Sequence, residues 1–340
     1  MLKAMLVGCG GMGTNWARIL DARSDIKIIG LVDVEASASA RLKERTGIDT
    51  ASYTNFEQGL EELRPDVVLD TSIPETRRYI AGTAMEQGCH VLSEKPLACS
   101  VQEAKELVSI ANSTGRTHAV MQNRRYLPGS QQVRELIESG EIGKLGMVCA
   151  DFFIGAHFEG FRLLMDNVLL LDMAIHTFDQ ARYMTGLDCD SAFCREFNLP
   201  SSWYEGNASA ICIFEMQGGV PFCYRGSWTA EGANTTWESS WRFVGDKGTV
   251  IWDGANPPYA EIVDSAQGFI RPTRKVSSDL NMDGPSGHPG CLNDMINALD
   301  SGEQPMTNSV DNAKSLGMVF AAIESAASGN TEPVLLNGLH

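Results

Sequence analysis

Residues 5–13 of the chain read Met5-Leu6-Val7-Gly8-Cys9-Gly10-Gly11-Met12-Gly13. A short apolar run thus leads directly into three glycines with the spacing G-x-G-x-x-G. With a strand before it and a helix after it, such a turn is typical of a dinucleotide-binding βαβ unit. The spacing assigns a tight turn to Gly8, close approach of a pyrophosphate to Gly10, and packing of helix on strand to Gly13. The alternative is that the glycines form only a turn.

A carboxylate follows at the position where such a unit binds ribose. Asp33 comes directly after the apolar run Ile26–Val32, 20 residues beyond Gly13. Its side chain would accept hydrogen bonds from ribose hydroxyls, unless it only caps a helix. No Arg or Lys occurs at positions 34–40 to neutralise a 2′-phosphate, which favours NAD over NADP. A methyltransferase that uses S-adenosylmethionine could share these features.

The first 122 residues alternate short apolar runs with amphipathic stretches. Strands that are apolar throughout, separated by helices, indicate a parallel sheet covered on both faces. We therefore expect a doubly wound α/β domain over residues 1–122, with Ser100 and Glu103 forming a capping box. The expected strands are Lys3–Val7, Ile26–Val32, Asp66–Asp70, His90–Ser93 and Thr117–Met121, and the expected helices lie near residues 13–22, 35–46, 54–63, 77–87 and 101–114.

The pattern changes after Arg124, where strands joined by short turns predominate. Such strands favour an open, largely antiparallel sheet, with helices packed on one face. We expect a second, α+β domain over residues 123–340. Its expected strands are Met147–Ile154, Ala208–Glu215, Phe222–Thr229, Ser239–Val244 and Thr249–Asp253, with Gly245–Gly248 as a tight connection, and its helices lie near residues 129–139, 169–185, 289–300 and 310–327.

The composition excludes several classes of protein. The 340 residues are 43% hydrophobic and carry a formal net charge of −16, which argues against binding nucleic acid through phosphate contacts. No apolar run approaches the ~20 residues of a membrane helix. The nine cysteines are scattered without a C-x-x-C pair, so neither a metal site nor a disulfide framework is expected. These features fit a cytoplasmic protein.

A second group of residues offers acid–base chemistry. Glu94-Lys95-Pro96 follows an apolar strand, and ligands of open α/β sheets bind outside the carboxyl ends of strands. Asp172 and His176 lie four residues apart, so a helix would place both on one face within apolar surroundings. Taken alone, Lys95 reads as a surface lysine, and Asp172 could merely satisfy a core histidine.

The glycine turn, the V-L-S-E-K-P-L segment at residues 91–97 and the D-x-x-x-H helix resemble the Gfo/Idh/MocA (glucose–fructose oxidoreductase / inositol dehydrogenase) family over essentially the whole chain. Gly287–Leu292 and Ser309–Ala313 also look like that family. The resemblance implies that Lys95 is the catalytic lysine and that Asp172 and His176 belong to the substrate pocket. The chain departs from the family pattern at Asp166–Val168, at Ala174, and at Arg77, where a histidine is common.

Together these observations predict an NAD-dependent oxidoreductase that transfers a hydride between nicotinamide and a secondary alcohol of a sugar or polyol. His176 would act as general base and Lys95 would stabilise the alkoxide. The alternatives are transient-oxidation chemistry with tightly bound NAD, as in a glycosidase or epimerase, and a catalytically silent nicotinamide sensor. From the family, a homodimer or homotetramer through the C-terminal sheet is expected. The candidate cofactor-binding residues are Gly8, Gly10, Gly11, Met12, Gly13, Asp33, Ser72, Pro74, Glu94, Lys95 and Asn123; the candidate substrate-binding residues are Lys95, Arg124, His157, Arg162, Asp172 and His176.

Overall fold

The computed structural model describes residues 1–281 and 283–339, and these form two compact units. The first unit consists mainly of Met1–Met121 and His288–Ala313, and the second of Gln122–Gly287 and Lys314–Gly338. The expected second domain, residues 123–340, differs from this division in the segment 288–313. The reason lies in contacts with the first sheet: the amide of Val120 donates to the carbonyl of Thr307 at 2.9 Å, and the ring of His288 packs edge-on against Trp16.

The first unit is built on a six-stranded parallel sheet with the order β3-β2-β1-β4-β5-β6. This is the strand order of a Rossmann fold, and it places the switch point between β1 and β4. Strand β1 is apolar and largely buried, and β6 is short. All five pairs of neighbouring strands are parallel. Their bounds are β1 (Leu2–Val7), β2 (Ile26–Val32), β3 (Ala51–Tyr53), β4 (Val67–Asp70), β5 (His90–Ser93) and β6 (His118–Val120).

Helices connect these strands. The capping box predicted for α5 is confirmed: the Ser100 hydroxyl accepts the amide of Glu103 at 3.1 Å, while the Glu103 carboxylate accepts the amide of Cys99 at 2.9 Å. The helices of this unit are α1 (Gly11–Asp21), α2 (Ala36–Thr46), α3 (Phe56–Leu63), α4 (Arg77–Glu86), α5 (Val101–Thr114) and α8 (Gly287–Ser301), and a 3-10 turn, η1 (Pro74–Thr76), precedes α4.

The second unit is built on a nine-stranded sheet with the order β14-β13-β12-β11-β7-β10-β9-β8-β15. Every neighbouring pair is antiparallel except β7 with β10. The fold class expected from the sequence, a Rossmann domain followed by an α+β domain with a largely antiparallel sheet, is therefore confirmed. The strands are β7 (Leu145–Phe153), β8 (Cys189–Phe197), β9 (Ser209–Met216), β10 (Val220–Ser227), β11 (Ser240–Gly245), β12 (Gly248–Trp252), β13 (Tyr259–Val263), β14 (Thr273–Ser277) and β15 (Glu332–Pro333).

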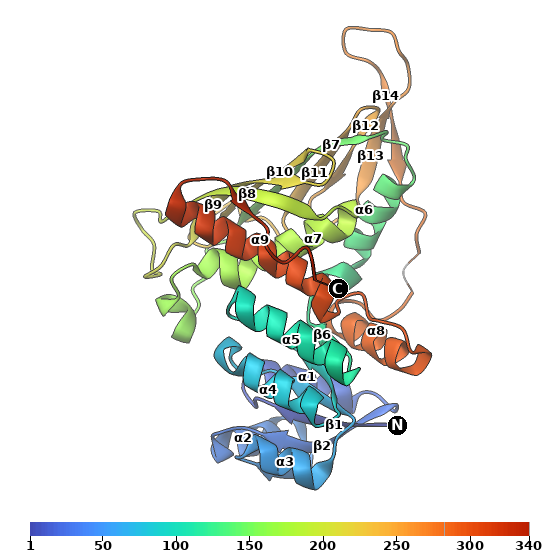
Figure 1. Cartoon of the computed structure of the whole chain (residues 1–340). Helices are drawn as coiled ribbons and strands as arrows, with labels where there is room; N and C mark the ends of the chain where they lie inside the picture. The colour runs from blue at the N-terminus through green and yellow to red at the C-terminus, as the bar shows by residue number, and fades with distance from the viewer. Residues whose placement is uncertain (282, 340) are drawn as a thin grey trace. The chain divides into compact units, whose positions relative to one another are not determined.

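One face of this sheet is covered by helices. Strand β9 shows this most clearly, because Cys212 and Phe214 are buried whereas Ile211 and Ile213 are about half exposed. Figure 1 shows α6 (Pro128–Glu138), α7 (Ile175–Thr185) and α9 (Ser309–Ser328) on the covered side. Short helical segments precede them: the 3-10 helices η2 (Asn123–Tyr126) and η3 (Gly160–Leu164) and the π-helical segment η4 (Leu169–Ala174).

Several elements were not expected from the sequence. Strands β3, β8, β13, β14 and β15 were missed, and the helix expected over 169–185 begins with π-helical hydrogen bonding. Strand β14 carries mostly polar, exposed residues, so it lacks an apolar signal. The tight connection between β11 and β12 is confirmed, since Val244 pairs with Thr249. Within residues 1–281 and 283–339, no helix has the length and apolar character needed to cross a membrane.

Candidate active site

The glycine-rich turn joins β1 to α1, and its glycines differ in what surrounds them. Gly8 has a φ of +89°, and a Cβ there would lie 2.7 Å from the backbone of Thr71. A Cβ on Gly13 would lie 2.0 Å from the carbonyl oxygen of Gly8. The fold itself therefore requires glycine at both positions. A Cβ on Gly10 or Gly11 would meet nothing within 4 Å, so this side of the turn is open to a ligand.

Asp33 is held rigidly at the carboxyl end of β2. Its Oδ2 accepts the amide of Cys9 at 2.7 Å, and its Oδ1 accepts the amide of Glu35 at 2.9 Å. Two backbone donors fix the carboxylate beside the glycine turn and leave its remaining lone pairs available to a ligand.

A cavity of about 480 Å³ opens beside Asp33 and the glycine turn. Its walls combine backbone and hydroxyl groups with apolar side chains, and its lining contains no Lys or Arg to pair with a 2′-phosphate. Gly10, whose surroundings are open, and the fixed carboxylate of Asp33 both border the cavity, so the residues present fit the adenosine half of NAD. The lining comprises Val7, Gly8, Gly10, Val32, Asp33, Val34, Thr54, Asn55, Phe56, Thr71, Ser72, Ile73, Thr76, Tyr79 and Ile80.

Eleven of these residues were not among the candidates from the sequence, namely Val7, Val32, Val34, Thr54, Asn55, Phe56, Thr71, Ile73, Thr76, Tyr79 and Ile80. Most follow the carboxyl ends of β2, β3 and β4, which is where ligands of such sheets bind. That rule was available from the sequence, but the strand β3 that introduces Thr54 was not recognised. Of the other cofactor candidates, Gly11, Met12 and Gly13 lie at the start of α1 and Pro74 begins η1.

The turn after β5 carries Lys95. Before it, the amide of Glu94 donates to the carbonyl of Asp70 at 2.8 Å, and the Glu94 carboxylate accepts the indole N–H of Trp16 at 2.8 Å. After it, Pro96 is buried. Lys95 itself is half-buried, at the carboxyl end of the parallel sheet. The residues on both sides of Lys95 are thus fixed in the first unit.

Asp172 lies in the π-helical segment η4 of the second unit. Its carboxylate pairs with Arg162, with 2.5 Å between Oδ2 and Nε and 3.4 Å between Oδ1 and Nη2. Arg162 in turn stacks over the rings of Phe158 and Phe161. π-helical turns are rare and occur frequently at functional sites. The structure thus brings two of the candidate substrate-binding residues together.

His176 lies in the first turn of α7, and its Nδ1 is 3.1 Å from the side-chain oxygen of Gln122. Gln122 is completely buried. An amide oxygen can only accept, so in the neutral imidazole this contact places the proton on Nδ1 and makes Nε2 the unprotonated nitrogen. Gln122 was not a candidate from the sequence, although it directly precedes the candidates Asn123 and Arg124.

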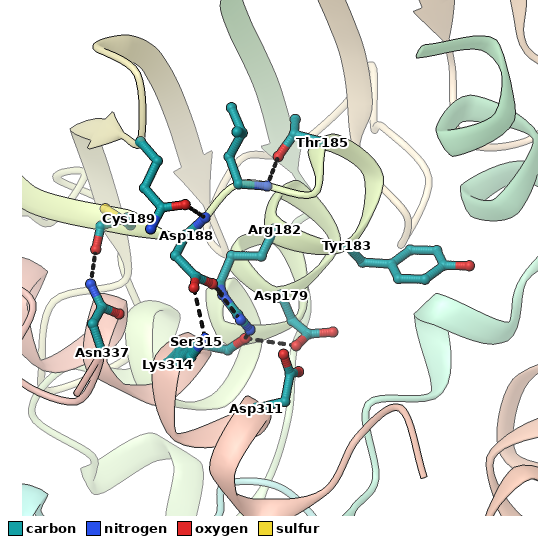
Figure 2. Close-up of polar contacts among 12 residues, drawn as sticks. Asp179, Arg182, Tyr183, Thr185, Asp188, Cys189, Asp311, Lys314, Ser315 and Asn337 are labelled. Atoms are coloured by element: carbon teal, nitrogen blue, oxygen red, sulfur yellow. Dashed lines mark hydrogen bonds and ion pairs between the residues drawn. The ribbon is translucent and has the colours of Figure 1, made fainter. Parts of the chain in front are cut away.

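A polar network anchors α7 within the second unit. Arg125 donates to both oxygens of Asp179 at 2.7 and 2.6 Å. Figure 2 shows how the network continues through Ser315, which donates to Asp179 and accepts from Arg182. Arg182 and Lys314 then share the carboxylate of Asp188.

Neighbouring cations favour the ionised form of Asp188. Burial opposes the charge of Asp188, but the hydrogen bond from Lys314 and the charge of Arg182 outweigh it and lower the pKa of this carboxyl group. Since His176 lies one helical turn before Asp179, the network fixes the helix that carries the imidazole.

The remaining substrate candidates lie in different surroundings. Arg124 is 6% exposed, and its Nη2 is 3.6 Å from the sulfur of Met173, next to Asp172. Burial lowers its pKa to about 10. His157 is exposed, stacks on Trp203 and pairs with Glu231 at 2.7 Å. Asn123 is half-buried at the start of η2.

Comparison with known proteins gives a consistent result for both units. Residues 2–122 match the family model GFO_IDH_MocA, described as "Oxidoreductase family, NAD-binding Rossmann fold", and residues 130–251 match the model "GFO/IDH/MocA C-terminal domain". Inositol 2-dehydrogenase of Salmonella typhimurium is 22% identical over 98% of this chain and 97% of its own length.

Solved structures share the whole fold. An oxidoreductase from Agrobacterium radiobacter, crystallised with NAD⁺, L-tartaric acid and magnesium, superposes with a TM-score of 0.85 at 21% identity over 98% of both chains. The WlbA dehydrogenase from Bordetella pertussis, in complex with NADH and UDP-GlcNAcA, gives a TM-score of 0.81 at 20% identity over 98% of both chains. At these sequence identities, the superpositions establish a shared fold and nothing more.

Proposed function

Since the chain belongs to the GFO/IDH/MocA family of NAD-binding oxidoreductases, we propose that it is an NAD-dependent dehydrogenase that oxidises a secondary alcohol of a sugar or polyol to a ketone. The observation that carries the proposal is the pair formed by His176 and Gln122 at 3.1 Å, because it prepares an imidazole to accept a proton. The inositol 2-dehydrogenase among the relatives supports a polyol as the substrate class.

Oxidation of an alcohol releases a proton and a hydride. The nicotinamide supplies the hydride acceptor when NAD⁺ is bound. In our proposal, Nε2 of His176 takes the hydroxyl proton, and the ammonium of Lys95 donates a hydrogen bond to the same oxygen as its negative charge develops. Asp172, oriented by Arg162, accepts a hydrogen bond from a neighbouring hydroxyl of the substrate.

The other candidate residues complete the proposal. Asp33 binds the adenosine ribose, and the open side of the turn at Gly10 and Gly11 receives the pyrophosphate. Ser72 lines the same cavity. Met12, Gly13, Pro74, Glu94 and Asn123 are proposed to shape or contact the cofactor site. Arg124 and His157 are proposed to contact the substrate together with Arg162.

The test is formation of NADH, followed by its absorbance, with a panel of inositols, aldoses and glucosides. Lys95→Ala should lower kcat roughly 100-fold or more while the Kd for NADH stays within about threefold. Lys105, an exposed lysine on α5, provides the matched control variant Lys105→Ala. Wild-type kcat in Lys95→Ala would refute the role of Lys95. Turnover without release of NADH would instead favour transient oxidation with tightly bound cofactor, and absence of any turnover would favour the sensor.

We also propose that the uncovered face of the second sheet joins copies of this chain into a dimer or tetramer. Met147, Phe193, Ile211 and Ile213 expose between 37% and 49% of their surface on this unit. Exposed apolar patches of this kind commonly mark interaction surfaces. Sedimentation velocity of Ile213→Asp against wild type tests this, and a wild-type protein that sediments as a monomer would contradict it.

A further inference from the structure

Arg77, the first residue of α4, forms an unusual set of contacts inside the first unit. Its side chain is 1% exposed. Nη1 donates to the carbonyl of Glu94 at 2.5 Å and to that of Pro96 at 2.8 Å. Nη2 donates to the carbonyl of Ser72 at 2.8 Å, and Nε lies 3.4 Å from the carboxylate of Asp70. One buried guanidinium therefore holds the residues on both sides of Lys95.

The same side chain also holds the loop that follows β4. Asp70 ends β4 and accepts both the amide and the hydroxyl of Ser72, at 3.0 and 2.5 Å. Thr71, Ser72, Ile73 and Thr76 of this loop line the cavity beside Asp33. Through Arg77, the cofactor-side loop 71–76 and the Lys95 turn share one hydrogen-bonding group.

An arginine is costly at this position, so its presence calls for a reason. A positive charge at the N-terminus of a helix opposes the helix dipole, and burial removes the guanidinium from water. The compensation is its planar group of five donors, which reaches three carbonyls and a carboxylate at once. A histidine, common here in the family that the sequence resembles, has at most two donors and cannot make this set of bonds.

We propose that Arg77 is a positioning residue that fixes the Lys95 turn and the cofactor-side loop relative to each other. The catalytic consequence rests on the proposed role of Lys95, whereas the structural consequence does not. Loss of the hydrogen bonds made by Arg77 should loosen the backbone at residues 94–97 and displace the ammonium of Lys95. A displacement of about 1 Å can lower a rate roughly 100-fold.

Arg77→Lys is the decisive variant, because it keeps a positive charge beside Asp70 but loses the planar fork. Arg78→Met is the matched control, since Arg78 is the next residue of α4 and pairs with Glu106 on the surface. Hydrogen–deuterium exchange of the peptide covering residues 94–97 should be about tenfold faster in Arg77→Lys and unchanged in Arg78→Met. The Kd for NADH should rise several-fold in Arg77→Lys only.

Exchange at the wild-type rate in Arg77→Lys would overturn the proposal, because a positive charge beside Asp70 would then be enough to fix the backbone at residues 94–97. If that variant does not fold, Arg77→Met combined with Asp70→Asn removes both charges and carries the same test. Global unfolding of both variants would also overturn the proposal, by assigning Arg77 to the stability of the whole unit. Neither exchange nor NADH binding needs an alcohol substrate, so failure of the proposed dehydrogenase activity would leave this test intact.

Discussion

Gly10→Ala should separate cofactor binding from folding. A Cβ on Gly10 meets no atom within 4 Å, and the backbone φ of −73° is open to any L-residue. The substitution reduces the entropy of the unfolded chain, which favours folding by about 0.4–1 kcal/mol. Gly10 is also the N-cap of α1, where alanine is less favourable than glycine by a similar amount. The two terms offset, so the free energy of unfolding should change by less than about 0.5 kcal/mol.

The cost should appear in the affinity for NADH. The methyl group would occupy the open side of the turn, where we propose that the pyrophosphate approaches the backbone amides. Losing one charge-assisted hydrogen bond costs about 1.5–3 kcal/mol. Because 1.4 kcal/mol is a factor of ten, the Kd for NADH should rise roughly 10- to 100-fold.

Gly13→Ala is the complementary variant. Its Cβ would lie 2.0 Å from the carbonyl oxygen of Gly8, and the amide of Gly8 is itself held by Val32 at 2.8 Å. The backbone cannot give way easily, so overpacking should exceed the gain in helix propensity and destabilise the apoprotein by about 2 kcal/mol. Urea denaturation measures stability, and titration of NADH fluorescence measures affinity. Wild-type affinity in Gly10→Ala, or wild-type stability in Gly13→Ala, would refute this division of roles.

Three further predictions follow from the described contacts. Asp33→Ala should raise the Kd for NADH about tenfold or more, measured by the same titration, because the ribose loses its carboxylate; an unchanged Kd would remove Asp33 from the site. Gln122→Leu should lower kcat roughly 10- to 100-fold at unchanged NADH affinity, because the tautomer of His176 is no longer fixed, and Gln102→Leu on the exposed face of α5 is its control. Burial raises the pKa of Glu196 to about 7 despite a hydrogen bond from Asn167, so this group destabilises the fold as pH rises from about 4.5 to 7. Glu196→Gln should therefore stabilise the protein by about 1–2 kcal/mol at pH 8, a value that allows for the partial exposure of the side chain, and should have little effect at pH 4. Urea denaturation at the two pH values measures this. Equal effects at both would contradict the raised pKa of Glu196.

The first unit was largely predictable because its signals are local. Five of its six strands are short apolar runs. The glycine turn directly follows β1, and the carboxylate of Asp33 directly follows β2. The second sheet was harder to predict. Strand β8 places Phe193 on the exposed face and Cys194 on the buried one, so apolar residues fall on both sides and the alternation is hidden. The parallel pairing of β7 with β10 joins strands separated by α7, β8 and β9, and short turns between neighbours cannot indicate it.

The candidate site shows the same limit more sharply. Lys95, Asp172 and His176 could be proposed because their side chains carry chemistry in a recognisable spacing. Gln122 and Arg77 could not be assigned roles, although Arg77 stood out as a departure from the family pattern. Three of the four acceptors of Arg77 are backbone carbonyls, at residues 72, 94 and 96.

A carbonyl is present at every residue, so the sequence does not reveal which of them a buried cation will bind. Only the arrangement of β4 beside β5 brings these three carbonyls within reach of one guanidinium. The residues that perform chemistry are therefore more visible in a sequence than those that position them. A departure from a family pattern at a buried position becomes informative once its acceptors are known, which is why Arg77→Lys tests the site more sharply than replacement of an exposed residue would.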